Sequence, residues 1–247
     1  IRTMGYSWET EYGIAADGEV ELSGRRYKVR FYVNEDRNLE PGDVVRMRAE
    51  LRLTDEGGAQ EPTFHRTRGI LLLLYPRGDA QVEKGSQSVR DLPARWAERL
   101  KGIIGRSFPG DAAPFAKALL LGDKIDLSWS QSREFSRSGI SHIVAVSGLH
   151  VSILFAFVST VTGKRRFLLV LLGIPVLLFF GAMAGFTASV TRAVIMQILF
   201  LLALGLNREY DPPTALSFAA LVMLVQCPLN IAGIGFQLSF ASVAGIF

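Results

Sequence analysis

The sequence predicts a mixed fold in two parts: a small β-rich part suited to water and a polytopic α-helical part suited to a membrane. Charge divides them sharply. Residues 1–142 hold 22 Lys+Arg and 21 Asp+Glu, whereas residues 143–247 hold five basic and two acidic residues. Short alternating stretches fill the first part and long apolar runs fill the second. The net charge of +4 is mild, so it does not by itself indicate a nucleic-acid partner.

Short strands separated by turn signals are expected from residue 6 to about residue 85. RYKVRFYV (26–33) alternates, with Tyr27, Val29, Phe31 and Val33 on one face. VVRMRAELRL alternates as well, with one apolar face made of Val45, Met47, Ala49, Leu51 and Leu53. EPGD at 40–43 marks the turn between them, and GILLLLY at 69–75 predicts a strand buried on both faces. This pattern predicts a small barrel of the OB type over residues 1–88.

The opposite faces of these two stretches form a candidate nucleic-acid interface. They carry Lys28, Arg30, Tyr32, Arg46, Arg48 and Arg52. Binding of single strands needs cations for the phosphates and an aromatic ring for base stacking, and this set offers both. Glu50 interrupts the run, and alternating charge on strands is also typical of a solvated face, so both interpretations stay open.

Residues 89–142 are expected to form amphipathic and linker helices. LPARWAERLKGIIGRSF carries an apolar stripe made of Leu92, Trp96, Leu100, Ile103 and Ile104. Its basic polar face suits a helix on a membrane surface, and a helix packed on the barrel fits equally well. A second helix is expected after Asp111, ending at Gly122, and a third after a capping box of Ser128 and Gln131.

Residues 143–247 predict a multi-pass membrane domain that is incomplete at its C-terminus. The expected spans are 143–163, 167–185, 186–206, 213–227 and 231–247, of which 213–227 also suits a short buried helix. The basic loop GKRR at 163–166 is expected on the cytoplasmic side. The first span then runs inward, which places residues 1–142 on the outer side of the membrane.

Polar residues interrupt these apolar runs and form the candidate site. They are His142, Ser147, His150, Arg192, Gln237 and Ser239. Ser147 and His150 share a helix face, but a hydrolase or a metal site would need a carboxylate, and none lies between Glu134 and Glu209. Two interpretations therefore remain for these polar side chains: they lock neighbouring helices together, or they line a route through the membrane.

Arg192 favours the lining interpretation. A charge at the bilayer centre costs roughly 2.5–3.5 kcal/mol, and such residues usually face a bundle interior or a water-filled cavity. The alternative is an arginine near the outer interface whose side chain extends to the headgroups. Gly181, Gly185, Ala188 and Ser189 precede it and offer a small-residue surface for tight packing or a narrow passage.

Four motifs in the same order resemble the competence domain of the ComEC family. They are ALLLGDK (118–124), SGISHIVAVSGLHVSIL (138–154), ASVTRAVIM (188–196) and GFQLSFASVAGIF (235–247). The preceding barrel is similar to the OB-type domain of that family. Such proteins also carry upstream helices, further spans and often a metallo-β-lactamase-like domain, so we expect these 247 residues to be a piece of a longer chain.

The resemblance implies a channel component that moves single-stranded DNA into the cytoplasm during natural transformation. It implies a multi-pass protein of the bacterial cytoplasmic membrane, with the OB-like domain outside. The implied partners are single-stranded DNA, membrane lipid, and competence proteins such as a DNA receptor and a cytoplasmic motor. No catalytic residue, metal or cofactor is assigned here. The alternatives are a membrane-embedded hydrolase that uses Ser147 and His150, and a binding module that is only anchored in the membrane.

Overall fold

The computed structural model describes residues 1–10, 13–22, 24–33, 39–54, 65–66, 69–85, 88–110, 112–123, 125–128, 133–135, 137–138, 147–163 and 165–246. The chain divides into two compact units, Ile1–Arg95 and Trp96–Phe247. The first unit holds a sheet of eight strands and the second holds helices, two of which are long and apolar. The mixed fold expected from the sequence is therefore confirmed at this level.

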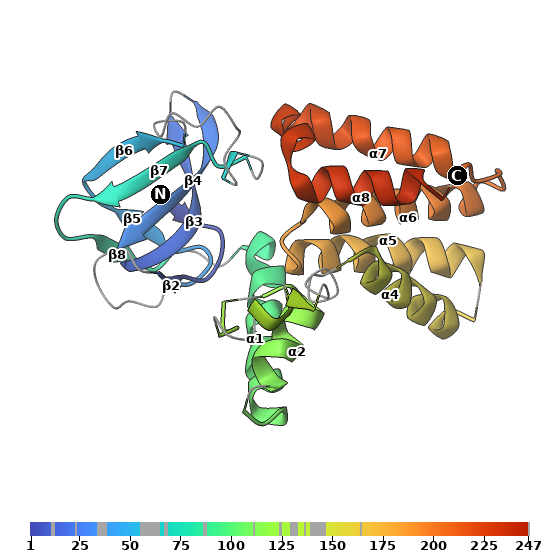
Figure 1. Ribbon diagram of the computed structural model, residues 1–247, viewed down its shortest axis with the longest axis horizontal. Coiled ribbons are helices and arrows are strands. Elements are labelled where there is room, and N and C mark those ends of the chain that lie inside the picture. The colour runs from blue at the N-terminus through green and yellow to red at the C-terminus, as the bar shows by residue number, and fades with distance from the viewer. Residues whose placement is uncertain are drawn as a thin grey trace. The chain divides into compact units, whose positions relative to one another are not determined.

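Eight strands of the first unit form a single sheet (Figure 1). The strands are β1 (Arg2–Thr3), β2 (Trp8–Thr10), β3 (Gly13–Leu22), β4 (Arg25–Val33), β5 (Val44–Arg46), β6 (Ala49–Leu53), β7 (Leu72–Pro76) and β8 (Gln81–Glu83). The hydrogen-bonded path runs β6-β7-β4-β3-β1-β5-β8, and β2 pairs with β3. The β4–β7 pair is parallel and the other pairs are antiparallel. Since β5 and β6 lie toward opposite ends of this path but follow each other in the chain, the sheet returns on itself.

The alternation predicted for β4 is confirmed. Val29, Phe31 and Val33 are buried in the core of the first unit, together with Val45 of β5 and Leu74 of β7. Fully burying side chains of this size stabilises a fold by about 1.5–3 kcal/mol each, so this cluster holds the curved sheet together.

The single strand predicted over residues 44–53 is wrong. The chain forms β5, leaves strand geometry at Met47 and Arg48, and resumes as β6. The break accompanies a change of partner, because β5 pairs with β1 and β8 whereas β6 pairs with β7. Leu51 and Leu53 consequently lie beyond the core and are exposed. In β7, Leu74 is buried but its neighbours are only half-buried, so the expectation of a strand buried on both faces is also wrong.

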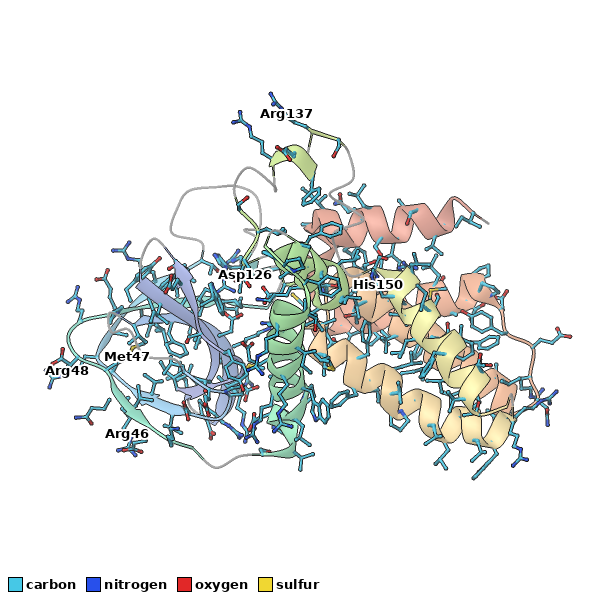
Figure 2. The ribbon with its side chains drawn as sticks, turned by 90° about the horizontal axis from the view of Figure 1, so that it is seen from below. Arg46, Met47, Arg48, Asp126, Arg137 and His150 are labelled. Atoms are coloured by element: carbon cyan, nitrogen blue, oxygen red, sulfur yellow. The ribbon has the colours of Figure 1, made fainter. Side chains whose placement is uncertain are left out.

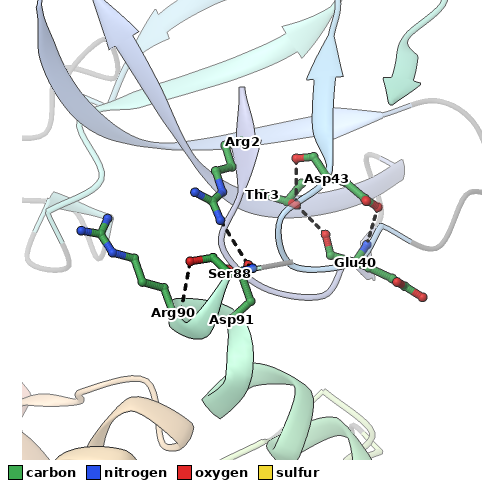
Figure 3. Close-up of polar contacts among 7 residues, drawn as sticks. All are labelled: Arg2, Thr3, Glu40, Asp43, Ser88, Arg90 and Asp91. Carbon is green, nitrogen blue, oxygen red and sulfur yellow. Dashed lines mark hydrogen bonds and ion pairs between the residues drawn. The ribbon is translucent and has the colours of Figure 1, made fainter. Parts of the chain in front are cut away.

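A polar network holds β1 in the sheet (Figure 3). The buried Thr3 hydroxyl donates to the carbonyl oxygens of Glu40 and Asp43, and the Asp43 carboxylate accepts the Glu40 N–H at 2.9 Å. Arg2 donates to the buried Asp91 carboxylate at 3.1 Å. The turn predicted for EPGD is confirmed, and buried polar groups that are fully paired in this way specify one arrangement of the chain.

The second unit is built from helices (Figure 1). After the short η2 (Val89–Asp91), they are α1 (Leu92–Ser107), α2 (Ala112–Leu121), α4 (Gly148–Val161), α5 (Arg166–Met183), α6 (Ala188–Gly205), α7 (Pro212–Gln226), η4 (Pro228–Ala232) and α8 (Ile234–Ala244). Short turns make α4, α5 and α6 alternate in direction, so α4 and α6 begin at the same end. Their core includes Val151, Leu177, Val190 and Leu201.

Two of these helices, α5 and α6, are long and apolar enough to cross a membrane, each with 18 residues. The described parts of α4, α7 and α8 are apolar but shorter, with 14, 15 and 11 residues. Five spans were expected from the sequence, and by length and composition the described residues supply two.

Helix α1 packs on α2 through Ile104, Ala116 and Leu121. The apolar stripe predicted for α1 is only partly buried, because Trp96 and Ile103 stay exposed. The second predicted helix ends where expected, since Gly122 has a φ of +74° that stops the helix. Asp111, Gln131 and much of the third predicted helix lie outside the described residues.

Candidate functional site

A polar pocket opens between α4, α6 and α8 of the second unit. Its volume is about 440 Å³. It is lined by Ser147, Gly148, Leu149, Ser152, Ser189, Arg192, Ala193, Met196, Gln197, Tyr210, Ser239 and Ser242. Hydroxyls, an amide and one guanidinium thus gather in a unit whose helices are otherwise apolar. We call this site the Arg192 pocket.

Arg192 is the charged centre of the pocket. Its side chain comes from the second turn of α6 and is buried, with 8% of the residue exposed. The Nε atom donates to the Ser239 hydroxyl of α8 at 2.9 Å, and Nη1 lies 3.8 Å from the sulfur of Met196. The side chain is thus directed toward α8 within the helical unit. Arg192 and Ser239 were separate candidates in the sequence, and in the structure their side chains are hydrogen-bonded to each other.

The Arg192 guanidinium has no acidic partner among the residues that the structure describes. A guanidinium has five N–H donors, and two of them have partners there. Glu209 and Asp211 are the acidic residues of 143–247. Asp211 accepts the Thr214 N–H at 3.1 Å and so caps α7. A buried cation without a carboxylate is costly, which makes Arg192 a candidate functional residue.

Ser147 and His150 form a local cap at the start of α4. His150 lies on the first turn of this helix (Figure 2). His150 Nδ1 accepts the Ser147 N–H at 3.2 Å and lies 3.4 Å from the Ser147 hydroxyl. The third residue of a helix reaches back in this way in a capping box. Because Nδ1 is engaged by this N–H, the pair is arranged for helix initiation, and Ser147 also lines the Arg192 pocket.

The remaining two predicted residues of this set lie elsewhere. Gln237 is exposed on α8 and donates to the Ile231 carbonyl at 3.0 Å, outside the lining of the Arg192 pocket. His142 lies outside the described residues.

Sequence reasoning missed most of the polar lining. It did not identify Ser152, Gln197, Tyr210 and Ser242, and it treated Ser189 only as a small residue for packing. A usable signal was present, because Ser189 precedes Arg192 by three residues and Ser242 follows Ser239 by three. That spacing places each pair on one helix face.

In the first unit, the predicted basic face is largely neutralised by carboxylates. Arg30 makes two hydrogen bonds to Asp17, at 2.8 and 3.1 Å, and its guanidinium lies 4.9 Å from the centre of the Trp8 ring. Tyr32 is buried and stacks on Tyr75, with ring centres 4.9 Å apart. Burial raises the pKa of Tyr32, and Tyr75 adds to the rise.

The other predicted cations occupy three different situations. Arg52 pairs with Glu50 at 3.1 Å, and Arg46 pairs with Glu83 at 3.4 Å. Arg48 projects outward from the break between β5 and β6 (Figure 2), and Lys28 is half-buried on β4. For these last two, the described residues supply no ion pair. Arg77, which the sequence reasoning missed, also reaches Glu50 at 2.9 Å.

Metal chemistry finds no support in the described part of the chain, where no three His, Cys, Asp or Glu residues come together. What the two sites offer is recognition: hydroxyls around one buried cation in the helices, and stacked rings with paired cations on the sheet.

Comparison with known proteins decides the family. A model of the Competence protein family matches residues 119–247, which is just over half of the chain. The chain belongs to the ComEC family of competence proteins. The match begins within α2 and runs through the helices that build the Arg192 pocket.

Individual curated proteins are similar to about half of this chain. ComE operon protein 3 of Bacillus subtilis (strain 168) is 30% identical over 139 residues, which cover 54% of this chain and 18% of that protein. Competence protein ComA of Neisseria gonorrhoeae is 29% identical over 147 residues, covering 55% and 21%. The chain therefore spans about a fifth of these ComEC-family relatives. No solved structure matches it significantly.

Proposed function

We propose that this chain forms part of a channel that carries one strand of incoming DNA across the bacterial cytoplasmic membrane. The observation that supports this most is the Arg192 pocket, which places a buried cation and several hydroxyls among apolar helices of a DNA-uptake family. Charged groups within membrane segments usually face water-filled paths, because lipid cannot solvate them. A strand with a phosphate on every nucleotide would need such a path.

The orientation proposed for the helices puts this pocket toward the outer side. Arg165 lies between α4 and α5 and Arg166 begins α5, and a basic junction of this kind is retained in the cytoplasm. The starts of α4 and α6 then face outward, and Gly148 and Ser189 from these starts line the pocket. In this scheme residues 1–88 form an outer domain, 89–142 linker helices and 143–247 an incomplete multi-pass domain.

The strand path supports an OB-type barrel for the outer domain. The order of pairing, the parallel β4–β7 pair and the return through β5 and β6 suit a five-stranded Greek-key barrel whose long strands are interrupted. Nucleic acid binds such barrels along strands two and three, which here are β3 and β4. We propose that Trp8 and Tyr75 stack bases there, that the buried Tyr32 supports Tyr75 from behind, and that the neighbouring cations guide the backbone.

The deciding experiment is done in the source cell. The gene is deleted, labelled duplex DNA is supplied, and label that becomes protected in the cytoplasm as single strands is counted. The channel predicts that surface binding persists while internal label disappears. Unchanged internal label would refute it. A DNA receptor and a cytoplasmic motor are the protein partners proposed in this scheme.

The short distance between Ser147 and His150 raises a second candidate, a hydrolase embedded in the membrane. His150→Gln separates the two. Glutamine at the third helical position keeps an acceptor for the Ser147 N–H, so a capping role keeps transformation near the wild-type level. A base in catalysis would not be replaced by glutamine, and activity would vanish. His150→Ala is the matched variant, and a capping role predicts a loss of about 1 kcal/mol in helix stability.

A further inference from the structure

The Arg192 pocket has the features of an anion site. Arg192 is more than nine-tenths buried and lines the pocket, and some of its guanidinium N–H donors have no partner among the described residues. No aspartate or glutamate is present among the described residues that line it. An ordinary buried arginine is neutralised by a carboxylate of its own chain, so this one is left for an anion from outside.

Two helix starts add to the field of the guanidinium. Gly148 and Leu149 belong to the first turn of α4, and Ser189 belongs to the first turn of α6. The first N–H groups of a helix have no partner within the helix, and they favour a negative charge. Gly148 lies against the cation: a Cβ added there would stand 3.5 Å from Arg192 Nη2. Anions bind where helix starts and a basic side chain converge.

Hydroxyls complete the lining and define the ligand more closely. The Ser147 and Ser189 hydroxyls line the pocket and can donate to oxygen, while Ser239 holds the guanidinium in place through Nε. The Ser152 and Ser242 hydroxyls already donate to the carbonyl oxygens of Gly148 and Ser239 and add only polar lining. Such donors suit an oxyanion with several oxygens better than a halide. The volume of about 440 Å³ falls within the usual range for small ligands, about 300–1,000 Å³, and holds more than a bare phosphate.

We propose that the Arg192 pocket binds one phosphodiester group of the DNA strand as it crosses the membrane. This inference rests on the proposed function and assigns that path a defined phosphate contact. The guanidinium takes the phosphate oxygens through Nη1 and Nη2, and Ser239 keeps it from turning away. With one such contact the strand is held by its backbone, so passage is independent of base sequence.

The test measures whether a ligand occupies the Arg192 pocket, so DNA bound by the sheet does not contribute to the signal. Ser189→Cys is introduced in a Cys227→Ser background, and the chain is reconstituted in nanodiscs of neutral phosphatidylcholine. A charged thiol reagent then reports on access to position 189. A single-stranded oligonucleotide should slow labelling roughly tenfold, consistent with a charge-assisted contact. The same oligonucleotide with an uncharged methylphosphonate backbone should not. No protection by the phosphodiester strand, or equal protection by both strands, overturns the proposal.

Variants and competing anions test whether Arg192 itself makes the phosphate contact. Arg192→Gln should abolish protection, Arg192→Lys should keep part of it, and Arg208→Gln, which removes an exposed charge from the same unit, should leave it unchanged. If Arg192→Gln does not fold, the comparison of the phosphodiester and methylphosphonate oligonucleotides on the protein with Arg192 intact still tests the proposal. Inorganic phosphate should compete weakly. Protection by phosphatidylglycerol without protection by DNA would make this a lipid site and overturn the proposal.

The uptake experiment in cells separates the two proposals. If deletion abolishes internal label but DNA never protects position 189, the channel stands and the phosphate contact falls. If DNA protects position 189 while deletion leaves uptake unchanged, the contact stands and the channel falls.

Discussion

The two units of this protein treat arginine in opposite ways. On the sheet, Arg30 and Arg46 each pair with a carboxylate of a neighbouring strand, Arg52 pairs with a carboxylate of its own strand, and these pairs lie at or near the surface. In the helices, Arg192 is buried against a serine and a methionine. Exposed ion pairs contribute little, typically below about 1 kcal/mol, whereas a buried cation without a carboxylate is costly. The sheet therefore neutralises much of its own charge, and the buried charge in the helices is the basis of the proposed phosphate contact.

The largest effect is expected from a substitution in the hydrophobic core of the sheet. Phe31→Ala is expected to lower the free energy of unfolding of the first unit by about 3–5 kcal/mol, because it leaves a cavity where the ring was buried. Leu53→Ala on the exposed end of β6 is the control, with about 0.5 kcal/mol or less. Hydrogen exchange of the β3 and β4 amides measures both. Equal costs would mean that β6 is covered by something else.

The next effect tests packing at the turn between α5 and α6. A Cβ on Gly181 would stand 2.6 Å from the ring of Phe186, a residue held at a positive φ of 47° by the turn between α5 and α6. Gly181→Ala should therefore cost about 1–3 kcal/mol. Gly235→Ala on α8 meets no atom within 4 Å and should be neutral or slightly stabilising. Thermal unfolding in detergent compares them, and a neutral Gly181→Ala would contradict the packing described.

A smaller effect distinguishes cations on the sheet. If the sheet binds single-stranded DNA, Arg48→Gln should reduce the slope of log affinity against log salt by about 0.7, the value for one phosphate contact. Arg46→Gln should reduce it less, since Glu83 already lies 3.4 Å from that guanidinium. Oligonucleotide titrations at several salt concentrations measure the two slopes. Identical losses would show that the ion pair does not shield Arg46, and no binding at low salt would leave only a solvated surface.

The smallest effect concerns acid. Hydrogen bonds from Arg77 and Arg52 hold the pKa of Glu50 below its usual 4.5. A carboxyl with a lowered folded pKa stabilises the fold above its unfolded pKa, and that contribution is lost as the pH falls through the folded pKa. Glu50→Gln should therefore differ slightly from the wild type at neutral pH and converge with it below pH 4.5. Unfolding curves across this range measure the difference, and a gap that widens in acid would reverse the assignment.

The sheet shows how far alternation alone can go. In β4 the pattern predicted which residues enter the core, because Val29, Phe31 and Val33 sit in one strand with one set of neighbours. The same pattern failed for residues 44–53, where alternation continues through Met47 and Arg48 although the strand changes partners. Alternation shows which residues share a face of a strand, but it does not show which strand lies beside it. Leu51 and Leu53 were therefore wrongly assigned to the same apolar face as the buried Val45.

The sequence by itself determined the features that depend on neighbours along the chain. These are the division into a charged and an apolar half, the turn at 40–43 and the faces of β4. The cap that joins Ser147 to His150 is also local, but it was recognised only in the structure. Only the tertiary structure decided that Arg192 meets Ser239 from 47 residues away and that both face a pocket shared by three helices. Periodicity fixes which residues share a face of one element, but which faces meet depends on packing between elements. The candidate site is therefore visible only after folding.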